Sequence, residues 1–117
     1  VGDEEDRAVA RAIYEYGMQR YSENDKKGAK ELFLVLYHTI DYDELKDAMM
    51  VHACLASGGV EFDRFIDEFV DVDSVDPYDV LAFFVMKFTK PTSTLLQEYN
   101  DELLKCKEEL KVLQESK

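Results

Sequence analysis

The spacing of hydrophobic positions along this chain is that of α-helices. Apolar residues recur every three or four positions from Asp3 to about Tyr21, and again in a segment that starts after a cap at Asn24 or Asp25. This spacing gathers them on one face of a helix, which then packs against other helices. No stretch alternates clearly between apolar and polar residues, as a half-buried strand does. The sequence therefore predicts an all-α fold with antiparallel neighbouring helices.

Two similar segments mark predicted helix starts. The segment 40–45 (IDYDEL) returns as 75–81 (VDPYDVL), about one helical hairpin later along the chain. Asp41 and Asp76 occupy the N-cap position in the two segments, and an acid follows each of them three residues later. Pro77 stands at the first helical position, where its missing N–H costs nothing. The repeat indicates an architecture of helical hairpins.

The remaining pattern bounds three further helices. The helix that starts at Asp41 is expected to run to Ser57, because Gly58 and Gly59 can end it with a positive φ. A loop at 71–75 precedes a fifth helix, Pro77 to about Phe88, which is apolar almost all round and which we therefore expect to be enclosed by others. Between them, a fourth helix is predicted from one apolar face: Phe62, Phe65, Ile66, Phe69 and Val70.

The last predicted helix follows Lys90-Pro91, with a cap at Ser93 or Thr94, and carries coiled-coil heptads. Its apolar positions alternate spacings of three and four residues: Leu96, Tyr99, Leu103, Cys106, Leu110 and Leu113. We predict that this stripe is the dimerisation seam of a homodimer, in which Glu102 and Lys107 attract each other across a parallel pair. The stripe has a second interpretation, as a closing helix that packs back on the helical domain.

The chain accordingly divides into two parts. Residues 1–91 are expected to form a domain of five short helices, and residues 92–117 a longer coiled-coil or packing helix. A length of 117 residues, with 46% hydrophobic and 34% charged residues, suits one globular domain with a real core. No membrane span or targeting segment is evident. Two cysteines are too few for a disulfide framework, so a reducing, cytoplasmic setting is expected.

The net charge of −12 narrows the class of partner. Nucleic acid and anionic membrane surfaces would be repelled, so neither is expected as the main partner. Most of the acidic excess lies between Asp41 and Asp79. That region is either a solvated face that keeps the domain soluble or a docking surface for a basic protein partner.

The sequence contains no convincing motif for metal, cofactor or catalysis. A calcium loop starting at Asp71 would place Asp76 where an EF-hand needs Gly, and Ala82 where it needs a bidentate Glu. His52 and Cys54 are two positions apart on a helix, which turns them to different faces. No nucleophile motif or phosphate loop is present. We therefore expect no metal, no cofactor and no enzymatic activity.

The tyrosines are the better candidates for recognition. A tyrosine can pack its ring against a ligand while its hydroxyl stays in water. On this ground we expect a partner-binding groove from among Tyr14, Tyr16, Tyr21, Tyr37 and Tyr42, although each of them also suits the core.

The spacing of Tyr14, Gly17 and Tyr21, followed by Ala29 and Phe33, resembles the tetratricopeptide repeat, whose small residues let two helices approach closely. A second, fainter match uses Met50, Ala53, Phe65, Phe69 and Pro77. Within that family, the chain is similar in spacing to the small acidic chaperones that hold translocator proteins in type III secretion. The resemblance implies a cytoplasmic dimer whose concave face binds an extended apolar segment.

These observations lead to one functional expectation and two alternatives. We expect a non-enzymatic protein-interaction or scaffold module that self-associates through its C-terminal helix. The first alternative is the chaperone that the resemblance implies. The second is a helical enzyme or ligand carrier with a cavity lined by the Phe-rich fourth and fifth helices.

Overall fold

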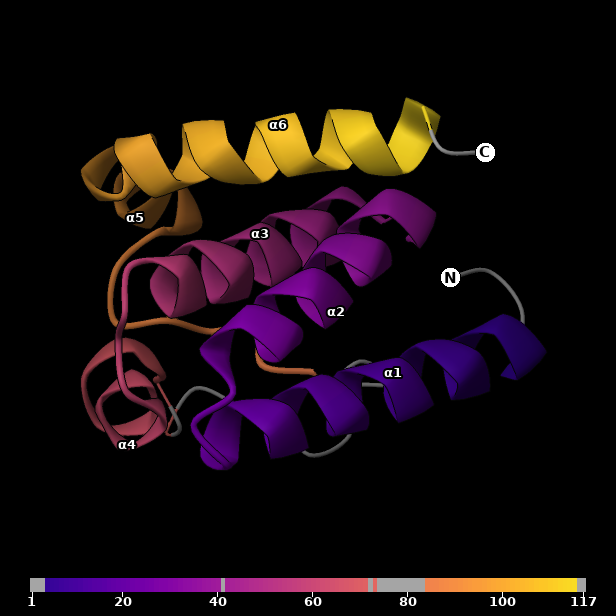
Figure 1. The fold of residues 1–117 in the computed structure, drawn as a ribbon. Coiled ribbons are helices and arrows are strands. Elements are labelled where there is room, and N and C mark those ends of the chain that lie inside the picture. The colour runs from indigo at the N-terminus through magenta and orange to yellow at the C-terminus, as the bar shows by residue number, and fades with distance from the viewer. Residues whose placement is uncertain (1–3, 41, 72, 74–83, 116–117) are drawn as a thin grey trace.

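The fold is known from a computed structural model, which describes residues 4–40, 42–71, 73 and 84–115 (Figure 1). Helices α2 and α3 lie in the middle of the molecule, with α1 along one side and α6 across the other. The described residues form helices and one isolated antiparallel β-bridge, between Val70 and Phe88. The predicted all-α class is confirmed.

The first two helices form a hairpin. Helix α1 (Glu4–Ser22) and helix α2 (Lys26–Thr39) are joined by a tight turn in which Asn24 has a φ of 68°. The Asp25 side chain caps α2 by accepting a hydrogen bond of 2.9 Å from the Gly28 N–H. Gly17 lets the two helices approach closely, because a Cβ atom at this position would lie 3.0 Å from Cε1 of Phe33.

Helix α3 (Asp43–Ser57) is the centre of the core. Every residue from Ala48 to Ala56 is buried, because α2, the C-terminal helices and the Tyr14 side chain of α1 pack around the helix. Tyr42 is its N-cap residue and makes no side-chain cap bond, while the predicted cap Asp41 lies outside the described residues. The helix ends as predicted at Gly58 and Gly59, and Gly59 has a φ of 80°.

The fourth predicted helix is shorter and wider than expected. One turn, α4 (Phe62–Arg64), continues into a π-helix, η1 (Phe65–Phe69), and the chain is extended at Val70. The Phe65 ring is fully buried and lies 5.5 Å from the Tyr21 ring and 5.0 Å from the His52 ring, measured between centroids. The second hairpin therefore pairs α3 with only about two helical turns.

The predicted fifth helix is wrong in its described part. Residues 77–83 lie outside the described residues, and the chain from Phe84 to Phe88 is not helical. Two backbone hydrogen bonds of 2.9 Å, from Asp71 N–H to Lys87 O and from Thr89 N–H to Phe69 O, pair this segment with 69–71. An extended segment can also bury an apolar run, and Phe84 is 2% exposed.

The C-terminal region contains two helices where one was predicted. Helix α5 (Thr92–Glu98) starts after Pro91, one or two residues before the predicted caps, and α6 (Asn100–Glu115) follows. Tyr99 interrupts the helix with φ −106° and ψ 38°. Helix α6 then runs across α3 and α2 and covers them (Figure 1).

Candidate functional site

Two of the predicted partner-binding tyrosines lie in the core. Tyr14 is 3% exposed and Tyr21 is 1% exposed. The Tyr21 hydroxyl donates a hydrogen bond of 2.6 Å to the Val60 carbonyl oxygen. Burial raises the pKa of both phenols above the ordinary value, so both remain protonated donors. Tyr14 and Tyr21 therefore hold helices together within the chain.

The other tyrosines are nearer the surface but do not converge. Tyr37 is half-buried, with the Lys46 ammonium 4.6 Å from its ring centroid. Tyr42 is 42% exposed, and its hydroxyl lies 3.3 Å from Oε2 of Glu44. Tyr16 is exposed and lies under the Arg20 guanidinium. With Tyr14 and Tyr21 in the core, the predicted tyrosine groove is not assembled.

A buried histidine network, which the sequence did not reveal, joins three segments. His52 on α3 is fully buried, with Nδ1 2.6 Å from the Ala48 carbonyl oxygen and Nε2 2.9 Å from the Tyr14 hydroxyl. Because a carbonyl oxygen only accepts, Nδ1 carries the proton and Nε2 accepts from Tyr14. The Val85 N–H in turn donates to the Tyr14 oxygen at 3.2 Å. Burial lowers the pKa of His52 to about 4, so the imidazole is neutral.

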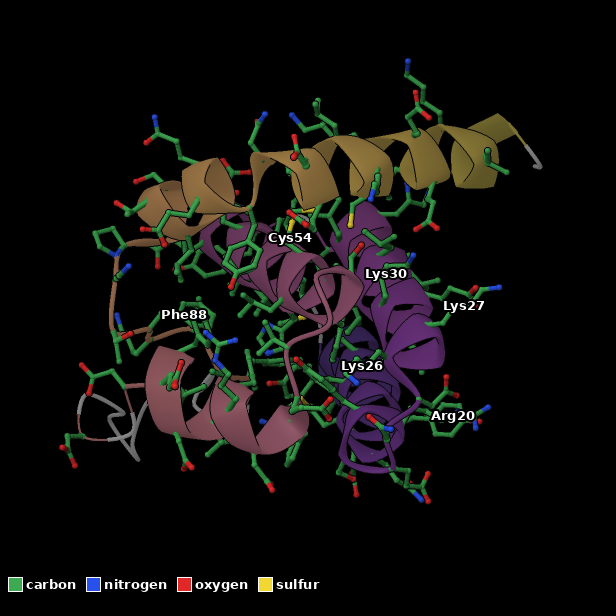
Figure 2. All side chains as sticks on the ribbon, turned by 60° about the vertical axis from the view of Figure 1, so that its left-hand side comes forward. Arg20, Lys26, Lys27, Lys30, Cys54 and Phe88 are labelled. Atoms are coloured by element: carbon green, nitrogen blue, oxygen red, sulfur yellow. The ribbon has the colours of Figure 1, made fainter. Side chains whose placement is uncertain are left out.

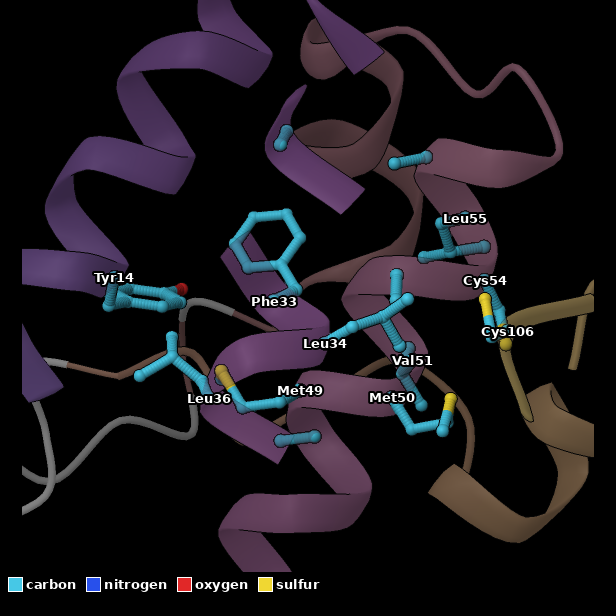
Figure 3. Packing of buried hydrophobic residues seen from close by; sticks show 14 of the residues in the cluster. Tyr14, Phe33, Leu34, Leu36, Met49, Met50, Val51, Cys54, Leu55 and Cys106 are labelled. Atoms are coloured by element: carbon cyan, nitrogen blue, oxygen red, sulfur yellow. The ribbon is translucent and has the colours of Figure 1, made fainter. Parts of the chain in front are cut away.

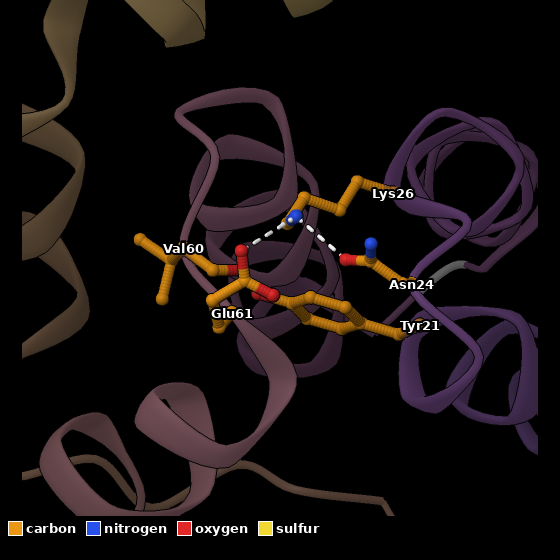
Figure 4. A network of polar contacts seen from close by, with 5 residues as sticks. All are labelled: Tyr21, Asn24, Lys26, Val60 and Glu61. Carbon is orange, nitrogen blue, oxygen red and sulfur yellow. Dashed lines mark hydrogen bonds and ion pairs between the residues drawn. The ribbon is translucent and has the colours of Figure 1, made fainter.

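A second polar network fastens the loop after α3 to the first hairpin (Figure 4). The Lys26 ammonium lies 2.8 Å from Oδ1 of Asn24 and 3.0 Å from Oε1 of Glu61. The Tyr21 hydroxyl reaches the carbonyl of the adjacent Val60. All three contacts are internal, so this network supports the fold.

The predicted seam faces the chain's own core. Cys106 is fully buried and Leu110 is 6% exposed, while Leu96, Tyr99 and Leu103 pack against the same core as half-buried residues. The Leu113 side chain lies outside the described residues. Self-association through these residues would require α6 to leave α3 or to be exchanged between chains, and it stays a prediction.

An apolar groove between α2 and α6 is the better surface for a partner. Its volume is about 300 Å³, and it is lined by Glu31, Leu34, Val35, Glu109 and Val112. Leu34 is 1% exposed and Val112 is 64% exposed, so the groove opens from a buried leucine to an exposed valine. We call this surface the α2–α6 groove.

At the edge of the α2–α6 groove, one of the two carboxylate oxygens of Glu109 has a donor among the described residues and the other has none. The Lys30 ammonium lies 2.9 Å from Oε1 of Glu109. The other oxygen, Oε2, is enclosed and has no hydrogen-bond donor among the described residues. Because this oxygen is closed off from the surface, it is a local cost of packing α6 against α2 and not a contact point for a partner.

A larger hollow lies elsewhere, between the start of α3 and the segment after Phe84. It has a volume of about 540 Å³. Its lining mixes acids with lysines and apolar side chains: Glu44, Asp47, Asp71, Met86, Lys87, Phe88, Thr89, Lys90, Pro91 and Thr92. This mixed lining does not select one class of ligand.

The lysines of α2 form a basic cluster beside the end of α3. Lys26, Lys27 and Lys30 lie along α2 (Figure 2), and all three also line a small hollow against the end of α3. Lys26 is paired with Glu61 and Lys30 with Glu109. Two of the three charges are therefore neutralised within the chain.

The described part of the chain shows neither a metal-binding cluster nor a membrane-spanning helix. That part contains no group of three or more His, Cys, Asp or Glu side chains arranged to hold a metal ion. None of the helices found there has both the length and the apolar content that crossing a membrane requires. Comparisons with protein-family models, curated proteins and solved structures gave no significant match to this chain.

The sequence reasoning missed the α2–α6 groove because its residues come from two helices far apart in the chain. Leu34 belongs to an obvious apolar stripe of α2, but Val112 lies outside the predicted heptad seam. Such an off-seam valine on the last helix was the one available signal. It becomes informative only once α6 is placed against α2.

Proposed function

We propose that this chain is a non-enzymatic protein-interaction module that binds an apolar, basic-flanked segment of a partner protein in the α2–α6 groove. The observation that carries the proposal is an apolar helix–helix groove that leaves Val112 64% exposed beside the buried Leu34. Grooves of this kind accept the apolar face of a partner helix or an extended apolar segment.

Charge selects among apolar segments. The chain carries a net charge of −12, and Glu31 and Glu109 border the α2–α6 groove. An acidic surface speeds the encounter with a basic partner and slows that with an acidic one. The favoured ligand therefore has an apolar stripe and flanking lysines or arginines.

Two synthetic peptides test the proposal. Both have leucines at helical spacing, and one is flanked by lysines and the other by glutamates. Fluorescence anisotropy should show saturable binding of the lysine-flanked peptide, which weakens as salt is added. A variant peptide with a proline at its centre identifies the bound conformation. The proline should abolish binding if the peptide binds as a helix, and should leave binding intact if the peptide binds as an extended segment.

Helix α6 offers a matched pair of variants. Val112→Asp changes the α2–α6 groove, whereas Leu104→Asp makes a similar change at a 55% exposed position that does not line it. Burial of a valine side chain is worth about 1.5 kcal/mol or more, so Val112→Asp should weaken binding about tenfold or more. Leu104→Asp should bind as the wild type does. Equal losses in the two variants, or no saturable binding of either peptide, would refute the proposal.

A further inference from the structure

The two cysteines of the chain meet in the core. Cys54 on α3 is 1% exposed and Cys106 on α6 is fully buried. Their side chains point toward one another, with the two sulfur atoms side by side (Figure 3). About half of the chain separates them in sequence, and both are free thiols. The contact exists because α6 folds back across α3.

The two thiols differ in acidity because they share a hydrogen bond. The bond from the Cys54 thiol to the Cys106 sulfur raises the pKa of Cys54, and burial adds to this effect. The same bond lowers the pKa of Cys106 by stabilising its thiolate. Lys30 lowers it further, while burial, Glu109 and Glu102 oppose the effect. Cys106 is therefore the better nucleophile of the pair.

We propose that Cys54 and Cys106 form a reversible redox site whose intramolecular disulfide ties α6 to α3. The oxidant is a low-molecular-weight disulfide, RSSR. Cys106 is fully buried while α6 lies on α3, so α6 must first open locally; the exposed Cys106 thiolate then attacks one sulfur of RSSR, forming a mixed disulfide and releasing RS⁻, which takes up a proton. Cys54 then loses its proton and attacks the Cys106 sulfur, which forms the internal disulfide and releases the second RS⁻. The protein loses two electrons and two protons, and RSSR is reduced to two RSH.

The disulfide would fix the position of α6, which helps to close the core over α3. Helix α6 covers α3 and also supplies Glu109 and Val112 to the α2–α6 groove. In the reduced chain, α6 is held by packing and by the Lys30–Glu109 ion pair. In the oxidised chain a covalent bond closes a long loop, which restricts the unfolded state and prevents exchange of α6 between chains. The redox site thus acts on the C-terminal helix whether or not a partner binds.

Equilibration of the full chain in buffers of reduced and oxidised glutathione tests the inference. We expect both thiols of the folded chain to become inaccessible to alkylation as the disulfide forms. The folded chain should form its disulfide at a lower ratio of oxidised to reduced glutathione than the urea-unfolded chain requires. Under denaturing conditions the product should run as a single chain with the mass of two fewer hydrogens, and digestion should yield a linked peptide that contains Cys54 and Cys106. The oxidised chain should unfold at a higher urea concentration, and dithiothreitol should restore the original midpoint.

Single variants separate this pair from a disulfide between two chains. Cys54→Ser and Cys106→Ser should each abolish the linked monomer. Pairing of Cys106 with Cys106 of a second chain would instead give a covalent dimer that survives Cys54→Ser, and that result would overturn the inference. The inference would also be overturned if the folded wild-type chain kept both thiols at a ratio of oxidised to reduced glutathione that oxidises the unfolded chain. Linked-peptide mapping uses the wild type, so the test holds even if a serine variant fails to fold.

Discussion

His52 makes the stability of this fold depend on pH. The imidazole is fully buried, its Nδ1–H donates to Ala48 O, and its Nε2 accepts from Tyr14. The rings of Phe33 and Phe65 lie 4.9 and 5.0 Å from it, between centroids. A second proton on Nε2 would put a charge among these rings and remove the acceptor of the Tyr14 hydroxyl, whose proton would have to turn away.

The size of the effect follows from the pKa of His52 in the two states. Burial lowers the pKa from 6.5 to about 4 in the folded chain. Above pH 6.5 both states are neutral and the full stability is present. Between pH 6.5 and 4 only the unfolded chain takes up the proton, so the free energy of unfolding falls by up to 1.4 kcal/mol per pH unit. The loss from this residue totals about 3 kcal/mol by pH 4.

Urea unfolding from pH 7.5 to 4.5 measures this loss, with His52→Gln as the variant. Glutamine does not titrate and still offers Tyr14 an acceptor, although it gives up ring packing and so lowers stability at every pH. The 26 acidic residues titrate in both proteins, so the informative quantity is the difference between the two pH curves. Between pH 7.5 and 4.5 the wild type should lose about 2.5 kcal/mol more stability than the variant does. Parallel curves for wild type and His52→Gln, or an imidazole NMR titration of His52 near pH 6.5, would refute the reasoning.

Two further substitutions test the packing of α1, again by urea unfolding. Gly17→Val should destabilise the fold by about 2 kcal/mol, because even the Cβ atom would lie 3.0 Å from the buried Phe33 ring. The control, Ala12→Val, places a valine at an exposed position of the same helix and should cost under about 1 kcal/mol. Equal losses in the two variants would contradict the close approach of α1 and α2. Tyr21→Phe should lower the free energy of unfolding by about 1–2 kcal/mol, because the Val60 carbonyl loses the hydroxyl that donates to it at 2.6 Å. The control, Tyr42→Phe at an exposed position, should change it by less than about 0.5 kcal/mol. A Tyr21→Phe variant as stable as the wild type would show that the hydroxyl contributes nothing.

Local signals accounted for the first half of the fold. The turn at Asn24 and the Asp25 cap separate α1 from α2 as predicted. The end of α3 was predictable because a glycine can adopt the positive φ that Gly59 shows. Each of these signals acts within a few residues, so a single sequence is enough to recognise it.

Signals of hydrophobicity alone were less reliable. The run that ends at Phe88 is apolar on all sides, which suits a buried helix and a buried extended segment equally well. In the described residues this run is extended, because the backbone groups of 69–71 form hydrogen bonds with those of 87–89. The same ambiguity affected Tyr14 and Tyr21, whose hydroxyls suit a wet groove as well as a core. They became core residues because His52 and Val60 supply their hydrogen-bond partners from distant positions.

The C-terminal stripe shows most clearly where a single sequence stops being informative. Spacings of three and four place Cys106 and Leu110 on one face of α6, whether that face meets a second copy or the chain's own α3. The choice depends on whether α3 presents a complementary surface, and that surface includes Cys54. Helix α3 is buried on nearly all sides, so it would expose apolar side chains to water if α6 left it. The fold-back therefore removes apolar surface that self-association would have to cover in another way, and the contact between the two cysteines is its chemical consequence.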